Sequence, residues 1–115
     1  MFTVVWTTPA SNTYSEVKSA AEKACKKRHE KGVSKSTKQE GLFKQIHKTI
    51  QLLLTDPKHN SLKTHEYDSI ENPYDAKKKV WEAYVQNKTP GAYRVFWCYG
   101  PKKGQITILS ITPYP

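Results

Sequence analysis

The last third of the chain constrains its fold most, because it contains three strand-like segments separated by short turn regions. Residues 80–86 alternate between apolar and polar side chains, which is typical of a strand with one buried face. Residues 92–99 are nearly all apolar apart from Arg94, which suits a central strand covered at least in part on both faces. A turn over residues 100–104 leads into a last strand over residues 105–111. These segments predict an antiparallel three-strand meander.

An N-terminal strand and a first helix are predicted before this meander. Residues 2–6 are rich in β-forming side chains, and Thr7-Thr8-Pro9 would close that strand. Thr13 followed three residues later by Glu16 matches a capping box, which predicts that the first helix begins at Thr13. Gly32 would end it.

The second helix has the strongest periodic signal in the chain. Thr37 and Glu40 make another capping box, and Asp56-Pro57 ends the helical pattern. Residues 58–79 look irregular, with room for a short strand over residues 62–67. The apolar positions that repeat at three and four residues are Phe43, Ile46, Ile50, Leu53 and Leu54. The two helices are expected to form an antiparallel hairpin joined by a polar connector.

This order of elements predicts one α+β domain over residues 1–115, with the helical hairpin packed against a sheet. No segment approaches the roughly 20 apolar residues of a membrane helix, and the N-terminus lacks the basic and apolar regions of a signal peptide. Cys25 and Cys98 are isolated, and the histidines have no metal-ligand spacing. We therefore expect reduced thiols in a cytoplasmic protein and neither a metal nor another cofactor.

The charge of the chain points to a polyanionic partner. It carries 19 basic and 10 acidic residues, for a net charge of +9, which favours nucleic acid, an anionic membrane surface or an acidic protein. Aromatic side chains lie beside Lys88 and Arg94 in the last third, and this mixture can hold RNA, although aromatic residues in strands are more often core. The aromatic residues are Trp81, Tyr84, Tyr93, Phe96, Trp97 and Tyr99. RNA is the first partner that the sequence predicts.

Several polar residues near the predicted sheet are candidates for a functional site. His65 could move a proton near neutral pH, or it could be a loop histidine bonded to the backbone. Glu82, Tyr84 and Gln86 share one side of a strand, and would surround a bound RNA strand or simply form a solvated face. Arg94 must reach a partner on the open face of the sheet, or else form a buried ion pair with Glu82.

Three segments, in order along the chain, resemble the RelE/ParE superfamily of bacterial toxins. Residues 56–65 resemble its NP-x-H-x-S-L-x-x-H stretch, and residues 90–97 resemble its YRV-x-W/Y strand. Residues 106–111 are similar to its last strand, which precedes a histidine–proline or comparable polar ending. The order β-α-α-β-β-β also matches, and the resemblance covers nearly the whole chain.

The resemblance implies two alternative activities. RelE-like members enter the ribosomal A site and cut mRNA through the RNA's own 2′-hydroxyl group, whereas ParE-like members poison DNA gyrase. Members of both branches are neutralised by a small antitoxin that is encoded alongside. We therefore expect a ribosome-dependent endoribonuclease with mRNA and a cognate antitoxin as partners. The alternatives are a non-catalytic member that binds gyrase or RNA, and a basic domain without toxin activity.

The resemblance also assigns roles to individual residues. Tyr114 stands where several members carry a histidine before proline, and tyrosine is a weaker base at neutral pH but can donate a hydrogen bond or stack. Cleavage needs a proton acceptor and cations that stabilise the developing phosphorane charge. The predicted catalytic residues are His65, Tyr84, Arg94 and Tyr114. The predicted RNA-binding residues are Lys63, Glu82, Gln86 and Lys88.

Overall fold

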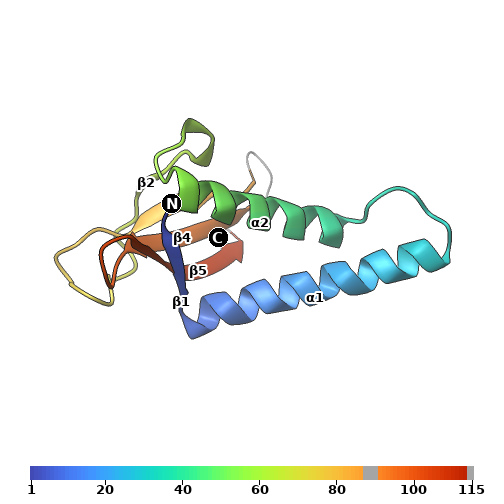
Figure 1. Ribbon diagram of the computed structural model, residues 1–115, viewed down its shortest axis with the longest axis horizontal. Helices are drawn as coiled ribbons and strands as arrows, with labels where there is room; N and C mark the ends of the chain where they lie inside the picture. Colours follow the sequence, from blue (N-terminus) through green and yellow to red (C-terminus); the bar gives the residue numbers. More distant parts are fainter. Residues whose placement is uncertain (87–90, 114–115) are drawn as a thin grey trace.

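The chain folds into a five-stranded sheet and a helical hairpin, as seen in a computed structural model that describes residues 1–86 and 91–113 (Figure 1). The elements are β1 (Thr3–Trp6), α1 (Thr8–Glu30), α2 (Lys38–Thr55), a 3-10 turn (Asn60–Leu62), β2 (His65–Glu66), β3 (Trp81–Tyr84), β4 (Tyr93–Tyr99) and β5 (Gln105–Pro113). The strand order is β1-β5-β4-β3-β2. β1 runs parallel to β5, and the other neighbours are antiparallel.

This architecture is the α+β fold that the sequence predicts. β3, β4 and β5 form the predicted meander, and β2 is the short strand expected near residues 62–67. β5 continues two residues beyond its predicted end at Ile111. Within the described part of the chain, no helix is long and apolar enough to cross a membrane.

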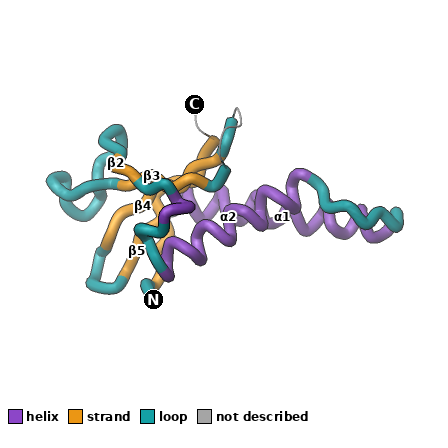
Figure 2. Tube along the Cα trace, turned by 90° about the horizontal axis from the view of Figure 1, so that it is seen from above, coloured by secondary structure: helices purple, strands orange, loops and turns teal. Residues whose placement is uncertain are grey.

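Both helices lie against one face of the sheet, and the far end of the hairpin projects well beyond it (Figure 2). The molecule is therefore elongated, at 52 × 27 × 23 Å. The core between the two layers is built from both helices and from the alternate strand residues that face them, because a strand turns every second side chain to the same side. Its fully buried members include Ile46 and Leu53 of α2, Val95 and Trp97 of β4, and Ile108 of β5.

The opposite face of the sheet is covered only in part. The loop over residues 67–79 folds across it, and the Tyr67 ring lies 4.5 Å from that of Phe96. The Tyr74 hydroxyl lies 2.8 Å from the Thr107 hydroxyl and ties the same loop to β5. A second, smaller apolar cluster forms under this loop. At the end of the face near β2 and the last residues of β3, the described residues leave His65 47% exposed and Tyr84 half-buried; we call this the uncovered end.

The start of α1 differs from the predicted one. The helix begins at Thr8, and the Thr7 hydroxyl accepts a hydrogen bond from the backbone N–H of Ala10 at 3.2 Å. Pro9 lies in the first turn, where its missing N–H would have had no partner inside the helix. Thr13 instead donates its hydroxyl to the Pro9 carbonyl at 3.1 Å. The predicted capping box at Thr13 is therefore wrong, because Thr7 and Pro9 start the helix one and a half turns earlier.

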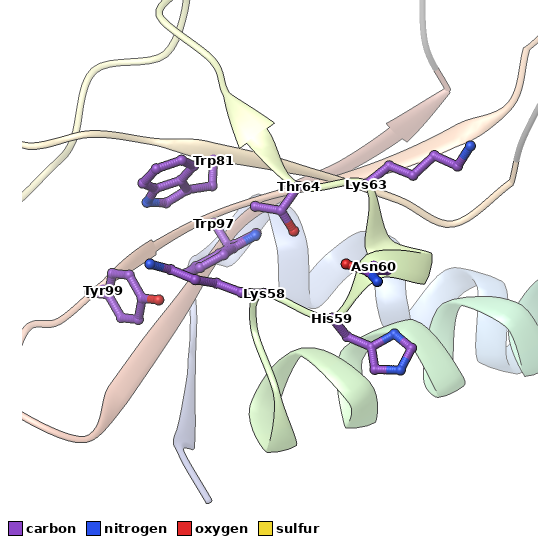
Figure 3. Close-up of a pocket in the computed structure, with 8 residues that line it drawn as sticks. All are labelled: Lys58, His59, Asn60, Lys63, Thr64, Trp81, Trp97 and Tyr99. Carbon is purple, nitrogen blue, oxygen red and sulfur yellow. The ribbon is translucent and has the colours of Figure 1, made fainter.

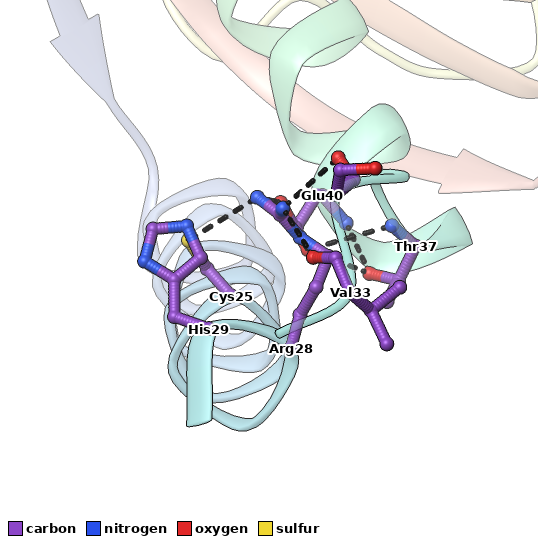
Figure 4. Close-up of polar contacts among 7 residues, drawn as sticks. Cys25, Arg28, His29, Val33, Thr37 and Glu40 are labelled. Carbon is purple, nitrogen blue, oxygen red and sulfur yellow. Dashed lines mark hydrogen bonds and ion pairs between the residues drawn. The ribbon is translucent and has the colours of Figure 1, made fainter. Parts of the chain in front are cut away.

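The capping box at the start of α2 is confirmed, and it is tied to the end of α1 (Figure 4). The Thr37 hydroxyl accepts from the Glu40 N–H at 3.3 Å, and the Glu40 carboxylate accepts from the Thr37 N–H at 3.4 Å. Arg28 of α1 donates two hydrogen bonds to the same carboxylate, at 2.8 and 2.9 Å. It also donates to the Val33 carbonyl at 3.1 Å. One arginine therefore fixes the connector between the helices.

Thr37→Ala tests the capping box. The variant leaves the Glu40 N–H without its side-chain acceptor, and we expect it to lower the free energy of unfolding by about 1 kcal/mol. Urea denaturation followed by circular dichroism measures this change. Thr13→Ala is the matched control, since Thr13 caps nothing, and its effect should stay within about 0.5 kcal/mol. Equal losses in the two variants would contradict the assignment.

The Arg28–Glu40 pair predicts a pH dependence of stability. The hydrogen bonds from Arg28 lower the pKa of the Glu40 carboxyl below its ordinary value. A carboxyl with a lowered pKa in the folded state stabilises the protein above its unfolded pKa of about 4.3, and loses this contribution as the pH falls through the folded pKa. Glu40→Gln keeps the shape of the capping box but cannot ionise. We expect the melting temperature of the variant to lie below that of the wild type at pH 7, with a gap that narrows below about pH 4. A gap that stays constant with pH would argue against the pair.

Candidate active site

Four polar residues come together at the uncovered end of the sheet face that is opposite the helices. We call His65, Glu82, Tyr84 and Arg94 the His65 cluster. The strand register brings them together: His65 of β2 lies opposite Glu82 of β3, and Tyr84 of β3 lies opposite Arg94 of β4. Alternation along β3 turns Glu82 and Tyr84 to this face, while the other two β3 residues pack in the helix-covered core.

His65 and Glu82 form a side-chain contact between β2 and β3. The His65 Nδ1 lies 3.0 Å from the Lys63 carbonyl oxygen, which can only accept, so Nδ1 must carry a hydrogen. The Nε2 atom of the same ring contacts a carboxylate oxygen of Glu82. The contact is an ion pair when the imidazole is protonated.

Arg94 places a positive charge beneath this pair. Its Nη1 donates to the carbonyl oxygens of Gln86, Tyr93 and Ala92 at 2.9, 3.3 and 3.4 Å. Its Nε lies 3.9 Å from the second carboxylate oxygen of Glu82. Both side chains are buried, with 9% and 2% of their surface exposed. Of the two alternatives for Arg94, the structure favours the buried ion pair with Glu82.

The cluster has a buried layer and an exposed layer. Glu82 and Arg94 lie inside, whereas the His65 side chain is 47% exposed and Tyr84 is half-buried. The guanidinium carbon of Arg94 lies 3.8 Å from the centre of the Tyr84 ring, which is a cation–π contact. The edge of the His65 ring meets Tyr84 at a centroid distance of 5.7 Å. A protonatable imidazole and a phenol thus face solvent above a fixed carboxylate and a fixed cation, as a site for proton transfer requires.

Comparison with known proteins supports this fold. No family model matches the chain, and no curated protein matches its sequence significantly. Among solved structures, the YoeB/ParE toxin from Agrobacterium tumefaciens is similar over 97% of this chain and 98% of that chain, with a TM-score of 0.59 and 10% identity. The chain has the YoeB/ParE toxin fold. The fold implied by the three sequence segments is therefore confirmed, at a sequence identity of 10%.

Within the YoeB/ParE fold, two predicted RNA-binding residues are placed differently from the prediction. Glu82 is 2% exposed, so it holds His65 and Arg94 and cannot lie along a bound RNA strand. Gln86 lies beyond the end of β3, where the alternation of the strand no longer applies, and its side chain donates to Gln45 of α2 at 3.0 Å. Its amide oxygen also accepts from the Tyr93 N–H at 3.2 Å.

The remaining predicted residues fall in three places. His65, Tyr84 and Arg94 of the predicted catalytic set are in the cluster. Lys63 supplies the carbonyl that orients His65, while its side chain lines a separate pocket on the other side of the sheet. Lys88 and Tyr114 lie outside the described residues.

The aromatic residues of the last third do not form one stacking surface. Trp97 belongs to the helix-covered core, Phe96 is covered by the loop on the opposite face, and both are almost fully buried. The alternative that strand aromatics are core residues is therefore right for these two. Tyr84 is the ring that lies in the His65 cluster, and Trp81 and Tyr99 line the pocket on the helix side.

Proposed function

We propose that this chain is the toxin of a toxin–antitoxin pair, and that it is an endoribonuclease that cleaves mRNA on the ribosome in the cytoplasm. One observation carries the proposal: the partly exposed His65 imidazole lies against the buried Glu82 carboxylate at the surface of a basic protein with the fold of a toxin. RNA cleavage requires a group that transfers protons to and from the reacting oxygens. The similar solved structure is described as a toxin, which supports the biological role.

The cluster suggests how the reaction runs. We propose that the exposed His65 ring turns its Nε2 from Glu82 toward the bound RNA, that Nε2 accepts the proton of a 2′-hydroxyl group there, and that this oxygen attacks the adjacent phosphorus. The bond from phosphorus to the 5′-oxygen breaks, and the same proton passes to that leaving oxygen. The products are a 2′,3′-cyclic phosphate and a 5′-hydroxyl end, so protons and electron pairs balance. Glu82 holds the imidazole between turnovers, and its charge stabilises the protonated form.

The other two members of the cluster act on the phosphate. The phosphorane gains negative charge as the 2′-oxygen attacks, and preorganised donors and cations stabilise it in a partly desolvated site. Tyr84 lies beside His65 with its ring over the Arg94 guanidinium, so its hydroxyl is placed to donate to a phosphate oxygen. Arg94 contributes its charge from below, because its Nη1 is committed to three carbonyl groups.

The net charge of +9 suits both proposed partners. Ribosomal RNA is a polyanion, and basic residues raise the rate and strength of association with it. The antitoxin that we propose is a small protein that lays a helix or strand over the uncovered sheet face and hides His65 and Tyr84.

Induced expression in bacteria tests the proposal. Growth and mRNA ends, mapped by primer extension, are followed after induction. We expect growth arrest together with new ends inside translated messages. Growth arrest with intact mRNA would overturn the ribonuclease assignment and point to the gyrase-directed alternative. Folded protein that causes no arrest would argue against a toxin of either kind.

A further inference from the structure

A second site lies on the helix side of the sheet, away from the His65 cluster. A pocket of about 350 Å³ opens between the end of α2, the 3-10 turn and strands β3 and β4 (Figure 3). We call it the aromatic pocket; its main lining residues are Lys58, Lys63, Thr64, Trp81, Trp97 and Tyr99. Its volume lies in the range of small-ligand sites. The strand alternation that sends Glu82 and Tyr84 to one face sends Trp81 and Trp97 to this one.

Flat rings form one side of the pocket. Trp81 and Trp97 are stacked with centroids 6.2 Å apart, and Tyr99 meets Trp97 edge-on at 5.0 Å. Trp97 is 1% exposed, whereas Tyr99 is 39% exposed and Trp81 is half-buried. Two partly exposed rings beside a buried one offer stacking area to a planar ligand.

The indole N–H of Trp97 is a buried donor without an acceptor among the described residues. Figure 3 draws its nitrogen on the side of the ring that faces Thr64, another lining residue. Buried donors are nearly always paired, and leaving one unpaired costs free energy. A ligand that brings an acceptor into this pocket would satisfy it.

The other polar groups of the pocket are mainly donors. Lys58 extends from the loop after α2 toward Tyr99, and Lys63 points away from the rings but lines the same pocket (Figure 3). Burial raises the pKa of Tyr99, so its hydroxyl group keeps its proton at neutral pH. Lys79 lies 5.7 Å from the Trp81 ring, but it pairs with Glu66 and does not line the pocket. The ligand that fits is therefore planar, rich in acceptors and anionic.

We propose that the aromatic pocket binds a nucleotide, with its base against Trp81 and Tyr99, its phosphate at Lys58 and one of its acceptors on the Trp97 indole N–H. The nucleotide is either a free mononucleotide or one unit of a single-stranded RNA, since both present the same chemistry. Stacking of bases on aromatic rings beside a basic groove is the usual basis of such binding. Binding at the aromatic pocket does not depend on RNA cleavage by the His65 cluster, because the pocket lies on the other side of the sheet.

Nuclear magnetic resonance of the ¹⁵N-labelled chain tests the proposal through the indole N–H signals of its three tryptophans. Trp6→Phe and Trp81→Phe assign the signals, so the buried Trp97 need not be changed. The probes are adenosine monophosphate, adenosine, inorganic phosphate and a hexamer of riboadenylate. We expect a saturable shift of the Trp97 signal with the monophosphate or the hexamer. Binding of the hexamer alone indicates an RNA unit, and equal binding of the monophosphate indicates a free nucleotide.

Lys58→Gln and Tyr99→Ala change exposed residues of the pocket, and each should weaken binding about tenfold. Lys26→Gln is the charge-matched control on α1 and should leave the dissociation constant unchanged. An equal loss in Lys26→Gln, or an equal shift with phosphate alone, would mean non-specific attraction and overturn the proposal. If the chemical shift of the Trp97 indole N–H does not change with nucleotides but changes with a glutamate-rich peptide, the pocket binds a protein partner instead. The His65→Ala variant should bind as the wild type does, which separates this result from the test of cleavage.

Discussion

His65→Ala and Glu82→Gln are each expected to reduce mRNA cleavage by about 10²–10⁴-fold, the usual contribution of general acid–base catalysis. The first variant removes the imidazole that exchanges the proton. The second keeps the size of the buried side chain but leaves a neutral amide, which cannot stabilise a protonated imidazole as a carboxylate does. Primer extension on a translated reporter message, sampled soon after induction, measures the rate.

His29→Ala is the matched control for these variants. His29 is an exposed histidine in the last turn of α1, where its Nε2 lies 3.8 Å from the Cys25 sulfur, on an element that does not contribute to the cluster. It should leave cleavage unchanged. Circular dichroism of each purified variant confirms that it is folded. If folded His65→Ala and Glu82→Gln cut as fast as the wild type, the His65–Glu82 pair is not the catalytic group.

Arg94→Met is expected to lower the free energy of unfolding by about 3–5 kcal/mol, which is typical when one partner of a buried ion pair is removed. Glu82 would keep its place in the core without the cation, and the carbonyl oxygens of Gln86, Ala92 and Tyr93 would lose a shared donor. Urea denaturation gives the change directly. In a domain of this size, the melting temperature should fall by roughly 10–20 °C.

A double variant tells a specific pair from a general loss of packing. If Arg94 stabilises the charge of Glu82, the losses in Arg94→Met and Glu82→Gln should overlap, so that Arg94→Met/Glu82→Gln loses about 0.5–3 kcal/mol less than their sum. Strict additivity would show that the two side chains act independently. Lys26→Met removes a cation from an exposed position and should change stability by less than about 0.5 kcal/mol.

The elements of the fold were largely predictable from local patterns. The capping box at Thr37 and the apolar repeat of α2 gave the second helix, and the three C-terminal segments gave the meander. The N-terminus of α1 was not predicted correctly, because Thr7 and Pro9 suit the end of a strand and the start of a helix equally well. Which of these two uses they have depends on where β1 and α1 pack.

Part of the candidate site was also predictable. The alternation of β3 placed Glu82 and Tyr84 on one side of a strand, and Arg94 stood out as the charged residue of an otherwise apolar strand. The predicted position of Gln86 on the same side as Glu82 was wrong, because β3 ends before Gln86 and its side chain turns to α2. The role of Glu82 changed from a surface contact to a buried partner, since a sequence pattern assigns a face but not a depth.

By itself the sequence determined the α+β class, the positions of most elements, the basic character of the chain and the faces on which Glu82, Tyr84 and Arg94 lie. The tertiary structure alone decided that His65 meets Glu82, because this contact depends on the register of a two-residue strand against β3. It also decided that Trp81, Trp97 and Tyr99 share a pocket with Lys58, a residue far from them along the chain. Local propensity and periodicity act over a few residues, whereas pairing register and the closing of a loop over a sheet depend on the packing of the whole molecule.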